Sequence, residues 1–109
     1  MDSNRHLISV PKDFSKTPGT RYIKQGPCSG EKFRTSCLIP ALEKYDLLIV
    51  DLDGTAGYGS SFIDEAFGGL IRREGFNAED LLRRIKIKSD EEIELIADVK
   101  KAFRDARPN

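Results

Sequence analysis

One segment near the middle of the chain limits the folds open to it more than any other. Four consecutive apolar residues, Leu47 to Val50, are followed at once by the run DLDGTAGYG over residues 51–59. A short apolar run that ends in turn residues is typical of a strand covered on both faces in a parallel sheet. We therefore expect a central parallel strand here, with Leu48 and Val50 on one face and Leu47 and Ile49 on the other.

Periodic patterns on both sides of this strand predict alternating strands and helices. Residues 6–10 and 85–88 fit short strands, and residues 21–24 fit a further one. Helical spacing covers residues 29–45, with an interruption at Pro40, and a second stretch that begins near Ser61. A short helix is expected at 77–82, and a last helix is expected between residues 89–92 and Arg107. The pattern predicts a single α/β domain over residues 1–109, with residues 1–4 frayed. Its small, mainly parallel or mixed sheet has 4–5 short strands and three main helices.

Several polar residues stand where helices are expected to begin. Ser29 and Asn77 are good N-caps, Ser61 with Asp64 resembles a capping pair, and Ser89-Asp90-Glu91-Glu92 matches the full capping box. The pair Gly68-Gly69 lies inside a helical pattern, where glycine lowers helix stability. That pair predicts a close approach to another backbone.

Composition excludes several classes of function. The chain has 18 basic and 18 acidic side chains and no net charge, so we expect neither nucleic acid nor a membrane surface as partner. Its apolar runs are far too short to span a membrane. Cys28, Cys37 and His6 are too few for a disulfide framework or a zinc site. We expect reduced thiols, a cytoplasmic protein and no metal or cofactor.

The aspartates that follow the central strand allow an enzymatic hypothesis. The run Asp51-Leu52-Asp53-Gly54-Thr55 resembles the first motif of haloacid-dehalogenase-type phosphatases. That resemblance implies Asp51 as phosphoryl acceptor, Asp53 as general acid–base and a Mg²⁺ ion held beside them. The family also needs a Ser/Thr, a Lys and a late acidic pair on later strands. Lys86 or Lys88 could supply the Lys, but no strand remains for the acidic pair. The simpler interpretation is a turn at Asp53-Gly54 and no catalytic residue.

A second resemblance covers more than half of the chain. The segments GPCSGEKFR (26–34), LIPALEKY (38–45), VDLDGTAGYGSSF (50–62) and EAFGGL (65–70) look like the STAS-like family of unknown function. That family is related to the STAS domains of anti-sigma-factor antagonists. The run from Gly57 to Phe62 is the most specific part of the resemblance.

The resemblance to antagonists implies a bacterial signalling module that is not an enzyme. Such a module is a monomer or homodimer and binds a histidine-kinase-type ATPase, which phosphorylates a serine at a helix start and thereby ends binding. Ser60 matches the modified position and Ser61 the second serine, although Gly59 replaces the usual Asp and Phe62 the usual small residue. The expected partner-binding loop consists of Asp53, Gly54, Thr55, Gly57, Tyr58, Gly59 and Phe62, with Tyr58 as an exposed anchor.

Overall fold

The computed structural model describes residues 4–108 and contains one parallel sheet. Its strands are β1 (Arg5–Ser9), β2 (Leu47–Asp51) and β3 (Ile85–Lys88), in the order β1-β2-β3. Both neighbouring pairs are parallel, with Ile8 beside Val50 and Val50 beside Ile87. The predicted central parallel strand is therefore confirmed.

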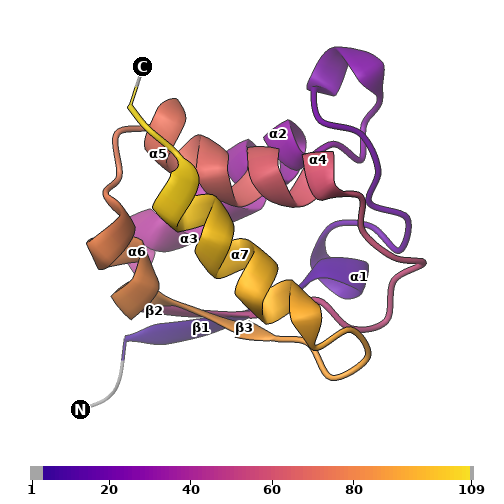
Figure 1. Cartoon of the computed structure of the whole chain (residues 1–109). Coiled ribbons are helices and arrows are strands. Elements are labelled where there is room, and N and C mark those ends of the chain that lie inside the picture. The colour runs from indigo at the N-terminus through magenta and orange to yellow at the C-terminus, as the bar shows by residue number, and fades with distance from the viewer. Residues whose placement is uncertain (1–3, 109) are drawn as a thin grey trace.

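The helices lie on one side of this sheet (Figure 1). Five α-helical segments occur in residues 4–108, more than the three main helices predicted. They are α1 (Val10–Asp13), α2-η2-α3 (Gly30–Phe33, Arg34–Leu38, Ile39–Lys44), α4-η3-α5 (Ser60–Ile63, Asp64–Gly68, Gly69–Arg72), α6 (Ala78–Arg84) and α7 (Glu94–Asp105). The wide π-helical turn η2 ends just before Pro40, which is where the sequence predicted an interruption.

The sheet has fewer strands than the predicted 4–5, because residues 21–24 form no strand. Tyr22 is extended, but Ile23–Gln25 form the 3₁₀ helix η1. The carbonyl of Arg21 accepts from the Glu31 amide at 3.0 Å, at the start of α2. The backbone of this stretch is thus paired with a helix terminus instead of a strand.

The two faces of β2 differ in burial, so the expectation of cover on both faces is wrong. Leu48 and Val50 have no exposed surface, whereas Leu47 and Ile49 are half-buried. Leu7 on β1 is 53% exposed. Crossovers between parallel strands are right-handed, and the order β1-β2-β3 advances in one direction only. Both connections therefore pass over the same face and leave the other uncovered.

The core between sheet and helices is built around aromatic rings. The ring of Phe33 lies 5.9 Å from Phe62 and 6.3 Å from Phe67, and Phe67 lies 6.0 Å from Phe103. These four side chains are essentially inaccessible to solvent. Their contacts join the segments that contain α2, α4 and α7, and so fix where the first turn of α4 sits relative to α7.

The beginning of the described chain is held in place at Asn4. Its carbonyl accepts from the Asp46 and Leu47 amides at 2.8 and 3.2 Å. Of the residues predicted to be frayed, Asn4 thus pairs with the start of β2, and residues 1–3 lie outside the described part. No helix within residues 4–108 has the length and apolar character needed to cross a membrane.

Candidate functional site

The loop after β2 lies at the carboxyl edge of the sheet and is held by its own side chains. The Asp51 carboxylate accepts from the Asp53 amide at 3.0 Å, and the Thr55 hydroxyl accepts from the Gly57 amide at 3.2 Å. Gly54 and Gly57 have φ values of 90° and 126°, which residues with a side chain rarely adopt. Aspartate turns and glycines thus define the loop, as the sequence indicated.

Asp53 connects this loop to the turn between β3 and α7. Its carboxylate accepts from the amides of Asp90 and Glu91, each at 2.9 Å, and from the Lys88 ammonium at 3.0 Å. The Glu91 and Asp90 amides, with help from Lys88, hold the pKa of Asp53 below its usual value. The Glu91 carboxylate in turn accepts from the Gly54 amide at 2.9 Å.

This geometry gives the phosphatase hypothesis no support. Both Asp51 and Asp53 already accept backbone hydrogen bonds that shape the loop, and Lys88 pairs with Asp53 and Asp90. In residues 4–108 no three His, Cys, Asp or Glu side chains are placed to hold a metal ion. No later strand in this range carries an acidic pair, since the sheet ends with β3.

The side chain of Tyr58 packs against the loop and the core and does not project into solvent as a fully exposed anchor. Its hydroxyl donates to the Leu52 carbonyl at 2.8 Å, and its ring lies 5.6 Å from that of Phe62. Burial raises the pKa of Tyr58 to about 12. The ring is half-buried, and Phe62 beneath it has no exposed surface. Phe62 was predicted to belong to the contact surface of the loop, and this is wrong because the core encloses it.

The helix that follows the loop begins at Ser60, with Gly59 as its N-cap residue. The Gly59 carbonyl accepts from the Phe62 and Ile63 amides at 3.1 and 3.3 Å, and no side chain caps the helix. The capping role predicted for Ser61 is therefore wrong, because the helix starts one residue earlier. Ser60 is exposed at its first position, whereas Ser61 is half-buried.

Of the other predicted helix caps, two are confirmed and one is wrong. Ser29 and Asn77 accept from the amides of Lys32 and Asp80 at 3.0 and 2.8 Å, as predicted. The capping box at residues 89–92 is wrong. Ser89 donates its hydroxyl proton to the Glu92 carbonyl at 2.6 Å, and α7 begins only at Glu94. The residues between form the turn whose amides bind Asp53.

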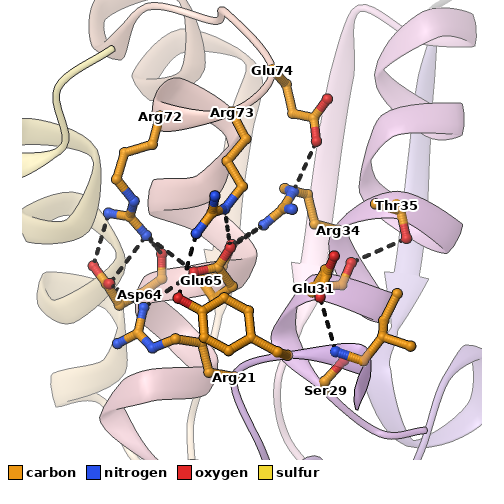
Figure 2. Close-up of polar contacts among 12 residues, drawn as sticks. Arg21, Ser29, Glu31, Arg34, Thr35, Asp64, Glu65, Arg72, Arg73 and Glu74 are labelled. Atoms are coloured by element: carbon orange, nitrogen blue, oxygen red, sulfur yellow. Dashed lines mark hydrogen bonds and ion pairs between the residues drawn. The ribbon is translucent and has the colours of Figure 1, made fainter. Parts of the chain in front are cut away.

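A buried ionic cluster, which the sequence patterns did not reveal, lies between η2 and η3. Glu65 has no exposed surface and Arg34 is 2% exposed, and their charged groups are 2.9 Å apart (Figure 2). Arg73 and Arg21 approach the same carboxylate at 2.6 and 3.2 Å. Burial raises the pKa of Glu65, but hydrogen bonds from Arg73, Arg34 and Arg21 outweigh it and lower the pKa to about 2.

Glycines make room for this cluster. A Cβ atom on Gly69 would lie 2.1 Å from a guanidinium nitrogen of Arg34, and one on Gly30 would lie 2.5 Å from the Phe62 carbonyl oxygen. The close approach predicted at Gly68-Gly69 is present, but the neighbours are the side chains of Arg34, Arg72 and Asp64 instead of a backbone. In the sequence, the glycine pair was the signal that could have pointed to this cluster, since two glycines in a helix mark a face on which a large side chain can pack.

The fold and the exposed helix start after β2 define a class: a small α/β module whose candidate site lies at the carboxyl edge of a parallel sheet. The family comparison is specific. The chain belongs to the family described as STAS-like domain of unknown function (DUF4325), whose sequence model matches residues 29–94. This range includes β2, the loop, both serines and, of the ionic cluster, Arg34, Glu65 and Arg73 but not Arg21. No curated protein and no solved structure matches the chain.

Proposed function

We propose that this protein is a non-enzymatic regulatory module that binds a histidine-kinase-type ATPase, as anti-sigma-factor antagonists do. Phosphorylation of Ser60 ends that binding. Membership of a STAS-like family supports the class of function. The observation that carries the site is the exposure of Ser60 at the first position of α4, directly after a loop of defined shape.

The difference between the two serines favours Ser60 as the modified residue. A kinase needs an accessible hydroxyl, and Ser60 is exposed while Ser61 is half-buried. Neither hydroxyl caps the helix, because Gly59 is the N-cap residue and no side chain accepts from the first-turn amides. Ser60 is therefore free of a structural role that modification would disturb.

The charge of a phosphate acts differently on the fold and on the complex. At pH 7 it adds about −1.5 to −2 charges. At the start of the continuous helical segment over residues 60–72, free amides tolerate a negative group. A partner surface that fits a neutral hydroxyl must instead desolvate the phosphate or move away from it. Modification therefore weakens the complex while the fold persists.

Calorimetry against the histidine-kinase-type ATPase encoded nearest to this protein tests the proposal. We expect Ser60→Asp to bind at least about tenfold more weakly, which corresponds to about 1.4 kcal/mol, while Ser60→Ala binds like wild type. Ser36→Asp is the matched control, because Ser36 is an exposed serine on a different helix. Equal affinities for wild type, Ser60→Asp and Ser61→Asp would remove the proposed switch.

A further inference from the structure

A groove runs beside Ser60, between the α4-η3 segment and α7. Its volume is about 360 Å³. Ile63, Leu95 and Ala102 form an apolar floor, and each shows less than a tenth of its surface. Tyr58, Gly59 and Ser60 close the groove at the end next to the loop.

One face of α7 forms a long wall of this groove. Leu95 and Ala102 lie on its floor, one heptad apart, and Glu94, Asp98, Lys101 and Asp105 line it from the same helix. From Glu94 to Asp105 the helix rises about 17 Å, or three turns. A groove of this length, with an apolar floor between two helices, matches the mode of recognition in which a partner helix inserts its apolar face.

The charge of the groove is strongly one-sided. Five carboxylates line it, and Lys101 is the one cation among its lining residues within 4–108. The carboxylates belong to Asp64, Glu92, Glu94, Asp98 and Asp105. Lys101 is paired with Asp105, and Asp64 with Arg21 and Arg72. Within residues 4–108, no Lys or Arg forms an ion pair with Glu92, Glu94 or Asp98. These unpaired carboxylates lie on a chain that has no net charge overall.

We propose that this groove binds a basic amphipathic helix presented by a partner protein. Apolar side chains of that helix contact Ile63, Leu95 and Ala102, and its Lys or Arg side chains pair with Glu92, Glu94 and Asp98. Charge complementarity selects the occupant, because an apolar helix with acidic flanks would place like charges together. The inference rests on the proposed function, since it assigns the chemistry of the partner segment at the same surface.

Ser60 connects this groove with the proposed switch. Because Ser60 lines the groove, a phosphate on its hydroxyl would occupy space that an apolar side chain of the partner helix needs. Modification then blocks entry of the helix even though its basic residues attract the phosphate. Weakening by Ser60→Asp should therefore persist at high salt, whereas weakening by loss of a carboxylate on α7 should fade there.

The experiment titrates the isotope-labelled full chain with designed helical peptides of about 14 residues, roughly 20 Å long. One peptide carries a Leu face flanked by Lys, the second has Glu in place of Lys, and the third has the Lys peptide's composition in scrambled order. We expect only the first to bind, with NMR shift changes confined to the groove. Asp98→Lys should weaken binding at least about tenfold at low salt. Glu43→Lys should leave it unchanged, because Glu43 is an exposed carboxylate of α3 outside the groove.

Several results would overturn the inference: no binding of the Lys peptide, equal binding of the Glu or scrambled peptide, equal effects of Asp98→Lys and Glu43→Lys, or self-association of the chain through the groove. Asp98→Asn gives a second variant if the charge reversal alters the fold. If the peptide fails while ATPase binding still responds to Ser60→Asp, the groove inference falls and the proposed function stands. If the peptide binds in the groove while ATPase affinity is unchanged by Ser60→Asp, the proposed switch falls and the groove remains a binding site for a basic helix.

Discussion

The α4-η3-α5 segment separates two charged regions that differ in almost every physical respect. Glu65 points into the buried cluster, where Arg34, Arg73 and Arg21 surround its carboxylate. Its neighbour Asp64 lies at the edge of the groove with α7, where several carboxylates have no cation beside them in the described part of the chain. One helix thus carries a paired, enclosed charge on one side and borders an unpaired, open set on another.

This contrast distinguishes structural charges from charges that remain available to a partner. A buried carboxylate must be paired, since an uncompensated charge in the interior costs several kcal/mol. An exposed carboxylate carries little energy of its own and can change partners freely. A carboxylate therefore stabilises the fold at Glu65, whereas the carboxylate of Asp98 remains available to a partner.

The largest effect is expected where the buried pair is broken. Glu65→Ala removes the buried one of the two carboxylates that pair with Arg34 and leaves it only the more exposed Glu74, and it should lower the free energy of unfolding by about 3–5 kcal/mol. Urea denaturation monitored by circular dichroism measures this change. Asp98→Ala on the groove side is the control, and a comparable loss there would contradict the distinction between the two regions.

The second-largest expected effect is on the pH dependence of the free energy of unfolding, to which the buried cluster should contribute through Glu65. The pKa of Glu65 is about 2 in the fold and 4.5 in its reference state. A folded-state pKa below the unfolded one stabilises the protein above the unfolded value, and this contribution, about 3 kcal/mol, is lost as pH falls from 4.5 toward 2. Unfolding measured between pH 6 and about 2 should therefore show a smaller decline in Glu65→Gln than in wild type. Parallel curves for the two proteins would refute this account.

Glycine replacements give a smaller and more local test. Gly69→Ala places a Cβ 2.1 Å from the Arg34 guanidinium, and the forced shift should cost about 1–3 kcal/mol. Gly59→Ala, beside the groove, meets nothing within 4 Å and has an ordinary φ of −80°, so it should cost only about 0.5–1 kcal/mol, because alanine is a poorer N-cap residue than glycine. Thermal melting of both variants makes the comparison, and equal melting temperatures would contradict it.

The smallest effect on stability belongs to the groove carboxylates. Glu94→Gln and Asp98→Asn should change the free energy of unfolding by no more than about 0.5 kcal/mol. Their effect should appear instead in binding of a basic peptide. A marked loss of stability in either variant would show that these carboxylates have a structural role.

The features that could be predicted from the sequence are those governed by short-range patterns. The apolar run at 47–50 and the alternation at 85–88 predicted the central strand β2 and the edge strand β3. Ser29 and Asn77 cap helices because the amides they bind are three residues away. The aspartates and glycines of residues 51–59 likewise predicted a loop, whose turns include the local bonds of Asp51 to the Asp53 amide and of Thr55 to the Gly57 amide. In these places neighbouring residues determine the structure.

The remaining features depend on partners far along the chain. Arg34 and Glu65 are 31 residues apart and meet only because η2 and η3 pack together. Residues 21–24 were predicted to form a short strand, but the amides of Gly30 and Glu31 at the start of α2 bind the carbonyls of Thr20 and Arg21. Ser89 looks like a cap, yet the following turn is drawn toward Asp53 from a different loop. Such competition cannot be seen in a local pattern.

The Asp53 contact with the Asp90 and Glu91 amides has a consequence for how motion spreads in this molecule. Because one carboxylate joins the loop before α4 to the turn before α7, we expect these two segments beside the groove to move together. The exchange rates of these two amide protons with solvent therefore report on the loop beside Ser60, although they belong to a turn some thirty residues later. A partner that seats in the groove should slow both rates together, and Asp53→Asn should accelerate them without a partner.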